Sequence, residues 1–574
     1  MNRAHNASAP AHGRRPAGWG GLLVLLLLLA ACDSDVPTVT PLPPPPSVVP
    51  SPVPPSATAA RQAPSAAPAP PTTTGVLGTA TPAPLALATA DVAVLTPVPT
   101  APGTGGRDTH STAGLLYLSN GSLAFYDVDH QEVRLLYDVG TDAAAPQRVV
   151  AFTVAPTGDR LAYLLTQQGT VAGACRQSSQ LWLLDMNAIN NRRLLAENLL
   201  PPTCDNSAPA RVVTGGMAFA PDGTRLAYLA ARAAEGPVDL WLATSEPARE
   251  PAPRRIAAPE AGLLLDPRWS PDGTALAFLQ AGDLGTNGSY DADLVLLPLP
   301  APGAQPGTPV LLASGHGLPG GAFALPPFDV TWLDAHTLGF QAWDPARGPA
   351  GAWAVDTAAS PPLPRLLTLN QAGLGAWSPA AAGPRRFAYR QASVGLALAG
   401  QADSGGVLLA TEPGAGPTGS IAPTWSAGGE VLAFSTAGGA LLIADRGHPG
   451  APVTVPISRT LRAAWNAVPG DPPLLATLAA DSPTLGIYDR AGRLLAQTQL
   501  PRTASSPQEI IWAPVTASQG IRRLAVRYAG GKDGNTPFVL ATFDQAQRTV
   551  AGVTGPPAAD GPLVWAELGP LPEP

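Results

Sequence analysis

Short apolar runs separated by tight polar turns recur along the chain from about residue 113 onward. In the clearest example, one apolar run ends at Trp269 and the next occupies Leu276 to Phe278. The connecting Ser-Pro-Asp-Gly-Thr suits a type I turn. Proline presets φ at the second position, aspartate can hydrogen-bond to nearby backbone, and glycine tolerates a positive φ. This stretch therefore predicts a β-hairpin.

The residue before the turn defines a frame that recurs about every 40 to 65 residues along the chain. Seven of the twelve tryptophans occupy this frame, which chance would not produce. The frame positions are Val154, Phe219, Trp269, Trp332, Trp377, Trp425, Trp465, Trp512 and Trp565.

Two further strands follow each hairpin. A third, continuously apolar run is seen at Leu181 to Asp185 and at Leu441 to Asp445, and a shorter fourth run at Arg192 to Leu195. Strands that are apolar throughout are covered on both faces. A repeat of this length built from four strands predicts an all-β fold of radially arranged four-stranded blades, a β-propeller.

The two ends of the repeat region complement each other. Residues 115–118, 122–127 and 132–137 fit strands two to four of a blade that lacks its first strand, and 563–566 fits a first strand with no blade after it. Strands from both termini are therefore predicted to close the ring, which removes exposed edges. The frame counts nine units. Because the unit at Trp465 is degenerate and could be an insertion, we expect eight blades, within a range of seven to nine. Two stacked smaller propellers are the alternative, against which the shared blade argues.

The x-W-S-P-D-G-x-x-L-A-F unit resembles the PD40, or WD40-like, repeat of the TolB family of β-propellers. The same unit occurs in the propeller domains of prolyl-oligopeptidase-type enzymes. The resemblance covers residues 114–569, is strongest at 217–230 and 267–280, and decays at 463–476. It implies a binding or scaffold role at the cell envelope. The separate N-terminal domain of TolB has no counterpart here.

Residues 1–31 have the features of an export signal, with three arginines followed by the apolar run Leu22 to Ala30. The end of this run and the two residues after it, Leu29-Ala30-Ala31-Cys32, resemble the bacterial lipobox, which implies that Cys32 carries lipid and anchors the protein outside the cytoplasm. An ordinary signal peptide with a chance cysteine is the alternative.

Residues 32–112 are rich in Pro, Ala and Thr, carry almost no charge, and include four consecutive prolines at 43–46. No periodic apolar face appears, so this segment is predicted to be a disordered linker between the membrane and a propeller at 113–570.

The charge balance argues against one class of function, and the cysteines predict one covalent link. With 34 basic and 41 acidic residues and a net charge of −7, the chain lacks the basic footprint of a nucleic-acid-binding protein. Cys175 and Cys204 remain once Cys32 is assigned to lipid. In an oxidising compartment this pair predicts a disulfide, with two free thiols as the alternative.

No local motif indicates catalysis or metal binding. The sequence has no G-x-S-x-G and no H-E-x-x-H, and its histidines share no metal-ligand spacing. Asp222 and Asp272 are interpreted as turn residues. The loop 283–293 fails the calcium-loop spacing, and the glycine-rich 315–321 lacks a strand-to-helix context. We therefore expect no catalytic residue, no metal, no cofactor and no enzyme.

The combined expectation is a monomeric, membrane-anchored extracytoplasmic lipoprotein whose propeller binds or scaffolds an envelope protein. The alternative is a ligand-sensing or enzymatic propeller that acts on a glycan or a peptide in its central channel. Carboxylates and aromatics that converge on one channel mouth would favour the alternative, and an exposed apolar patch would favour the scaffold.

Overall fold

The computed structural model describes residues from Thr112 to Leu568, with gaps in several connections, the longest at 201–215. The predicted hairpin turn recurs in four places with the same geometry. The amide of Gly223 donates to the carbonyl of Ala220 at 2.9 Å, and Gly273 repeats the bond to Ser270 at 2.9 Å. Both glycines have a positive φ, 68° and 69°. The turn chemistry read from the sequence is confirmed, because a residue with a side chain would be strained at that φ.

The described strands fall into four-stranded antiparallel units. The first strands are β4 (Gln147–Val154), β8 (Met217–Phe219), β12 (Leu263–Trp269), β16 (Pro327–Trp332), β20 (Ala372–Trp377), β24 (Thr424–Trp425), β28 (Thr460–Trp465), β32 (Pro507–Trp512) and β36 (Val564–Leu568). The second strands are β5 (Arg160–Val171), β9 (Arg225–Ala231), β13 (Ala275–Ala281), β17 (Thr337–Asp344), β21 (Arg386–Gln391), β25 (Val431–Ser435), β29 (Leu474–Ala479), β33 (Ile521–Tyr528) and β1 (Thr112–Ser119).

The third strands are β6 (Ala174–Asp185), β10 (Val238–Thr244), β14 (Ala292–Pro298), β18 (Gly348–Asp356), β22 (Gly395–Gly400), β26 (Leu441–Asp445), β30 (Thr484–Asp489), β34 (Asn535–Asp544) and β2 (Ser122–Asp127). The fourth strands are β7 (Arg192–Glu197), β11 (Arg254–Ala257), β15 (Val310–Ser314), β19 (Arg365–Leu366), β23 (Val407–Thr411), β27 (His448–Thr454), β31 (Leu494–Gln499), β35 (Thr549–Ala559) and β3 (Glu132–Tyr137).

The number of blades depends on how one pairing is counted. Hydrogen bonding defines eight sheets, of which seven are four-stranded and one is eight-stranded. The large sheet is two units, β8–β11 and β12–β15, joined by a single parallel pairing of Val238 with Leu263. Counted by strands, the described residues form nine units. Eight sheets and nine units both lie within the range that the sequence predicted.

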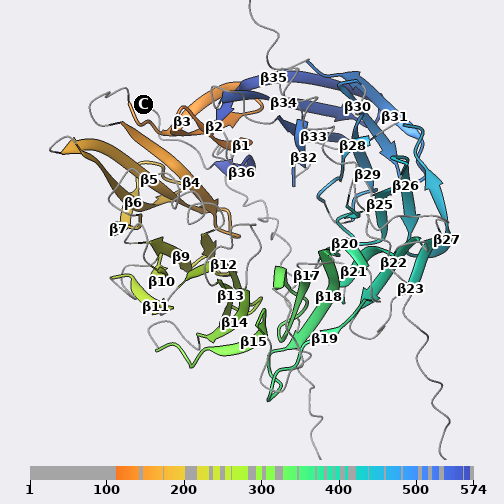
Figure 1. The fold of residues 1–574 in the computed structure, drawn as a ribbon. Coiled ribbons are helices and arrows are strands. Elements are labelled where there is room, and N and C mark those ends of the chain that lie inside the picture. The colour runs from red at the N-terminus through yellow and green to blue at the C-terminus, as the bar shows by residue number, and fades with distance from the viewer. Residues whose placement is uncertain are drawn as a thin grey trace, which may run out of the picture. The chain divides into compact units, whose positions relative to one another are not determined.

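Within the unit from Asp91 to Pro574, the sheets follow one another around a ring (Figure 1). First strands of successive units contact each other, as β8 does with β4 and with β12, and they form the inner side of the ring. The fourth strands form its outer side. β1 pairs with β36 from Thr112↔Leu568 to Leu116↔Val564, so strands from both ends of the propeller share one blade. The predicted closure is confirmed.

The core lies between neighbouring sheets. All residues of β2 and of β9 are buried, because both faces of the middle strands are covered. One apolar cluster joins β28–β31 to β32–β35 and contains Leu474, Ile487 and Leu524. Full burial of such a side chain contributes about 1.5–3 kcal/mol each. Each blade is therefore stabilised by its two neighbours.

The N-terminal predictions fall outside the described residues. Cys32 and the linker at 32–112 lie before β1, apart from Thr112 itself, and the predicted domain boundaries remain predictions. Among the described residues, no helix is long and apolar enough to span a bilayer.

Candidate functional site

The frame tryptophans link each blade to the preceding one. The indole Nε1–H of Trp269 donates to the carbonyl of Ala218 at 2.9 Å, and that of Trp512 donates to Ala464 at 2.9 Å. The same bond is made by Trp332 to Arg268, Trp425 to Ala376, Trp465 to Thr424 and Trp565 to Ile511. The acceptor is always the residue before the preceding frame position. The frame tryptophans therefore link neighbouring blades and do not form a ligand site.

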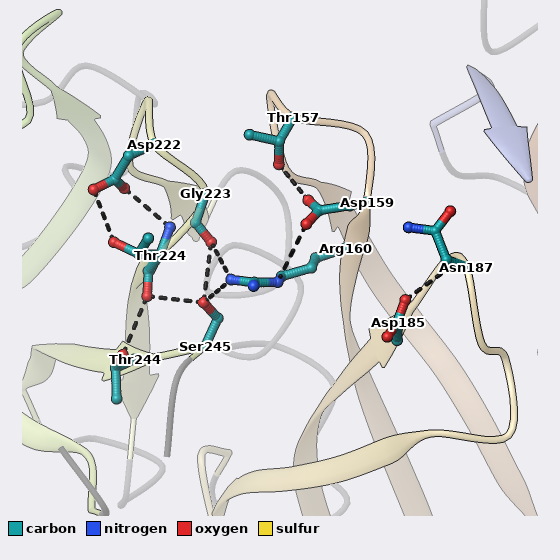
Figure 2. A network of polar contacts seen from close by, with 10 residues as sticks. All are labelled: Thr157, Asp159, Arg160, Asp185, Asn187, Asp222, Gly223, Thr224, Thr244 and Ser245. Atoms are coloured by element: carbon teal, nitrogen blue, oxygen red, sulfur yellow. Dashed lines mark hydrogen bonds and ion pairs between the residues drawn. The ribbon is translucent and has the colours of Figure 1, made fainter. Parts of the chain in front are cut away.

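A polar network covers the hairpin turns of the first two units after the closing blade (Figure 2). The Arg160 guanidinium at the start of β5 donates to the Gly223 carbonyl at 3.3 Å and to the Ser245 hydroxyl. Ser245 in turn donates to the carbonyls of Gly223, at 3.2 Å, and Thr224, at 3.0 Å. Asp222 accepts from the amide and hydroxyl of Thr224 at 2.9 and 2.8 Å. These groups bind one another across two blades, which gives the network a structural role.

An arginine at the equivalent position makes a similar contact at the next boundary between blades. Arg225, at the start of β9, donates to the Gly273 carbonyl at 2.6 Å and stacks on the Trp269 ring at 4.7 Å from its centroid. Burial lowers the pKa of Arg225 from its usual value. At the last boundary Arg523 binds Asp129, across the closing blade. In the sequence each of these arginines directly precedes Leu-Ala, and the sequence analysis did not identify them as contact residues between blades.

Aspartates at the ends of third strands hold the following turn. Asp489 accepts from the amides of Ala491 and Arg493, both at 2.9 Å. The same side-chain-to-backbone turn is made by Asp127, Asp185, Asp356, Asp445 and Asp544. These residues were missed as turn residues, although aspartate after an apolar run is the available signal.

Asp222 and Asp272 occupy the turns as predicted. Asp272 accepts from the amide of Thr274 at 3.0 Å, from its hydroxyl at 2.8 Å, and from the Ser270 hydroxyl at 2.5 Å. Partial burial alone would raise the pKa of Asp272, but these hydrogen bonds outweigh it and the pKa lies below its usual value. A carboxylate with its acceptor sites occupied in this way is structural.

Two inner strands differ from the rest because aspartates with left-handed backbone interrupt them. Asp266 in β12 has a φ of 50° and Asp329 in β16 a φ of 48°, each at a bulge three residues before the frame tryptophan. Left-handed backbone at non-glycine residues is uncommon and is often found at binding sites. Bulges of this kind re-aim side chains.

The two aspartates form one polar cluster. Asp266 pairs with Arg268 at 2.8 Å, and Gln341 on β17 donates to Asp329 at 2.6 Å. Desolvation raises the pKa of Asp329, with Asp266 adding to the rise and the Gln341 bond and Arg268 opposing it. Asp329 is nevertheless exposed to water. The Asp329 carboxylate is therefore partly surrounded by protein while water still reaches it.

Aromatic side chains lie beside this cluster. Phe328 precedes Asp329 and packs edge-to-face on Trp343, with ring centroids 6.2 Å apart. Trp343 is 39% exposed, which is unusual for a tryptophan that has an apolar neighbour. Carboxylates, an amide and an accessible aromatic ring therefore gather at the same end of β16 and β17.

The outer side of the ring carries exposed aliphatic side chains. Nine of the eleven large apolar side chains that are exposed among the described residues lie on fourth strands. They are Val133, Leu135, Leu194, Leu311, Val407, Leu408, Val453, Leu494 and Val553. In β23, β27, β31 and β35 they follow one another around four successive blades, and β23 contacts β27 as β31 contacts β35. We call Val407, Leu408, Val453, Leu494 and Val553 the rim band.

The predicted cysteine and metal features are not brought together by the described residues. Cys175 lies in β6, where its backbone pairs with Thr170, and Cys204 lies outside the described residues. The disulfide remains a prediction. The part of the chain that the structure describes contains no cluster of three or more potential metal ligands. Most of the loops 283–293 and 315–321 lies outside the described residues.

Comparison with known proteins adds little at the level of sequence. No protein-family model matches the chain, and no curated protein matches it. The assignment to PD40 repeats or to the TolB family therefore remains a prediction.

Solved structures that match the chain include prolyl oligopeptidases. One comes from a study of two prolyl endopeptidases, with 14% identity and a TM-score of 0.36, covering 76% of this chain and 54% of that one. Another is prolyl oligopeptidase B of Galerina marginata bound to a 25mer macrocyclization substrate, with 10% identity, a TM-score of 0.39, and coverage of 76% and 56%. The chain spans little more than half the length of these proteins.

The expectation that the protein is not an enzyme is contradicted by these matches, since the solved structures that it resembles are enzymes. That expectation rested on the absence of local motifs. A site assembled from side chains of separate blades leaves no such motif in the sequence, so the absence could not exclude catalysis. The likeness concerns the fold and assigns no activity to this chain.

Proposed function

We propose that the propeller is a protein-binding module that holds an envelope partner against its outer side. The observation that supports this function is the rim band. Exposed apolar side chains scattered singly are normal on a protein surface, whereas neighbouring ones that form a patch mark interaction sites. Val407 and Leu408, exposed by 48% and 39%, are adjacent in β23 and begin the band.

Side chains rather than backbone would make this contact. A free outer strand offers unpaired backbone groups to which a partner strand could add. Here the pairing of third and fourth strands carries a bulge in most units, for example between Leu396 and Ala397 opposite β23 and between Ile487 and Tyr488 opposite β31. Bulges at sheet edges disfavour strand addition. The aliphatic side chains remain available.

We further propose that the protein is anchored by lipid on Cys32 and faces the extracytoplasmic space, as a monomer on a proline-rich linker. The support is the order of the basic residues, the apolar run and Leu-Ala-Ala-Cys in the sequence. The anchor would keep the rim band close to other envelope proteins, which raises their effective concentration.

The test is site-specific photo-crosslinking of the full-length protein in its native host. A benzophenone side chain is placed at Leu408, at Val453 or at Leu494, and at Leu194 of β7 as a control. Leu194 is exposed by 38% and lies on the outer strand of a unit outside the band. We expect one partner protein to be captured from the three band positions and not from Leu194. Capture of this partner from Val453 should be lost in the Leu408→Arg, Leu494→Arg double variant.

Absence of any crosslinked protein at the band, or equal capture at Leu194, would refute the binding role of the band.

A second candidate function is ligand binding at the inner strands, because the cluster of Asp266, Asp329 and Gln341 lies at the same end of the blade as Phe328 and Trp343. Aromatic rings with neighbouring carboxylates and amides suit a glycan or a peptide. Titration of the protein with a neutral oligosaccharide should change Trp343 fluorescence in the wild type and not in Trp343→Phe. No change in the wild type would remove this candidate.

A further inference from the structure

A hollow lies between the units β28–β31 and β32–β35, at the connections β28–β29, β30–β31 and β34–β35, next to Leu494 of the rim band. Its volume is ≈ 320 Å³, at the small end of the range for ligand pockets. We call it the arginine groove. Its lining residues are Pro472, Pro473, Leu474, Asp489, Arg490, Arg493, Leu495, Gln545 and Arg548.

The floor of the arginine groove is apolar and firmly packed. Leu474 is only 3% exposed and belongs to the apolar cluster shared by the two units. Pro472 and Pro473 lie beside it and have restricted backbones. Leu495 completes the apolar lining. A floor supported by the core changes little on binding, which limits the entropy lost when a ligand is held.

The charged residues of the arginine groove are unequally paired. Arg493 binds Asp489 at 2.7 Å, and Arg490 binds Asp445 of the neighbouring unit at 2.5 Å. Arg548 is exposed, has a φ of 52°, and has no hydrogen-bond or ion-pair partner among the described residues. One positive charge therefore stays uncompensated in a protein whose net charge is −7.

The unused hydrogen-bond donors of Arg490 and Arg493 also favour an anionic ligand. A guanidinium has five N–H donors, and the bonds of Arg490 to Asp445 and of Arg493 to Asp489 use only a few of them. Their side chains are 49% and 78% exposed, so the remaining donors are accessible. Asp489 engages only one side of the Arg493 guanidinium, and its other oxygen accepts from the amides of Ala491 and Arg493.

We propose that the arginine groove binds an acidic peptide segment of a partner protein, in which carboxylates alternate with aliphatic side chains. The guanidiniums match carboxylates in geometry and charge. The proline and leucine floor matches aliphatic side chains, which a free inorganic anion would leave unused. The arginine groove adjoins the rim band at Leu494, but the peptide assay below changes no rim-band residue, so it tests this site separately from the proposed binding at the rim.

The test measures fluorescence anisotropy of a fluorescein-labelled Glu-Leu-Glu-Leu-Glu peptide with the full-length protein in detergent. The labelled Gln-Leu-Gln-Leu-Gln peptide is the uncharged control. We expect the acidic peptide to bind and the glutamine peptide to bind at least about tenfold more weakly, since charge-assisted bonds are lost.

Two variants assign the binding to the site. Arg548→Ala removes the uncompensated cation and should weaken binding of the acidic peptide by about tenfold. The circular dichroism spectrum should not change, because Arg548 has no hydrogen-bond or ion-pair partner among the described residues. Arg148→Ala, which removes an exposed arginine of β4 that likewise has no hydrogen-bond or ion-pair partner for its side chain among the described residues, is the matched control and should bind as the wild type does. Equal weakening by both variants, or none by Arg548→Ala, would overturn the proposal.

Inorganic phosphate is the competitor that separates a peptide site from a simple anion site. Displacement of the labelled peptide by phosphate at the concentration at which the unlabelled peptide displaces it would overturn the proposal. Displacement only by the unlabelled peptide would support it.

Discussion

At the scale of single residues, the frame tryptophans explain why the repeat uses indole where a phenyl ring would fill similar space. The ring packs into the core, and its Nε1–H reaches a carbonyl of the preceding blade, which gives a buried polar atom a partner. Trp377 is the exception. Its Nε1 is buried and finds no acceptor among the described residues.

This exception supplies a matched pair for mutation. Trp512→Phe should lower the free energy of unfolding by about 1–2 kcal/mol more than Trp377→Phe does, because only the first substitution leaves a carbonyl unpaired. Denaturant titration of both variants against the wild type measures the difference. Equal losses would mean that ring packing alone accounts for the tryptophan frame.

Asp329 and Asp272 should respond to pH in opposite directions. The pKa of Asp329 is raised, so its ionised form costs stability at pH 7, and this cost disappears as the pH falls through its folded pKa. Asp329→Asn should therefore raise the thermal midpoint at pH 7 and lose this advantage toward pH 4. The pKa of Asp272 is lowered, so its contribution is present above the unfolded value and is lost as the pH falls.

Asp272→Asn should accordingly lower the midpoint at pH 7, with a smaller loss at acid pH. Calorimetry of both variants at pH 7, at pH 4 and at about pH 2.5 checks the two signs, because the contribution of Asp272 is lost only below its unfolded pKa. Shifts of the same sign at pH 7 would contradict the assignment of these environments.

At the scale of elements, the sequence was sufficient for the hairpins and insufficient for what joins them. The Ser-Pro-Asp-Gly turn is local, so its chemistry can be read directly from four letters. The contact of Arg225 with Gly273 and Trp269 joins residues of different blades. Nothing in the sequence near Arg225 indicates its partner, because the partner depends on how two blades pack.

The inner strands show the same limit. A positive φ is readily inferred at glycine, but Asp266 and Asp329 adopt it without that signal. The polar cluster that they form with Gln341 needs β12, β16 and β17 to lie together. Sequence reasoning named carboxylates and aromatics as the feature that would favour a ligand site, yet it could not say which residues would supply them.

The arginine contact between blades predicts a measurable loss. Arg225→Met keeps the aliphatic bulk but removes the bond to Gly273 and the stacking on Trp269, and should cost about 1.5–3 kcal/mol, as expected for a hydrogen bond to a charged group. Arg148→Met removes an exposed arginine of β4 whose side chain has no hydrogen-bond or ion-pair partner among the described residues, and should cost less than about 0.5 kcal/mol, as is usual for surface substitutions. Urea unfolding of the two variants compares them. A loss for Arg148→Met as large as for Arg225→Met would show that the interblade contact is energetically unimportant.

At the scale of the whole molecule, the pairing of β1 with β36 converts a row of blades into a ring. A cysteine pair at Ala113 and Glu567, which are partners across this pairing, should form a disulfide and raise stability by about 2–4 kcal/mol, since it restricts the unfolded chain. Calorimetry with and without reductant measures the gain. The same measurement on Ala113→Cys alone, which should show no reductant effect, is the control.

Anchoring is the other property of the whole molecule. Cys32→Ala should abolish incorporation of radiolabelled palmitate and release the protein from the membrane fraction or leave it unprocessed. Equal labelling and equal fractionation of variant and wild type would exclude lipid attachment at Cys32. The rim and inner-strand variants provide controls, because they should keep the label.

The shared blade also orders the events of synthesis. β1 leaves the ribosome first among the described strands, and its partner β36 leaves last. Until then β1 has one unpaired edge, and an unpaired edge invites association with other chains. The blade that closes the ring is therefore the last to become complete. During nearly all of its synthesis the nascent chain exposes the unpaired edge of β1.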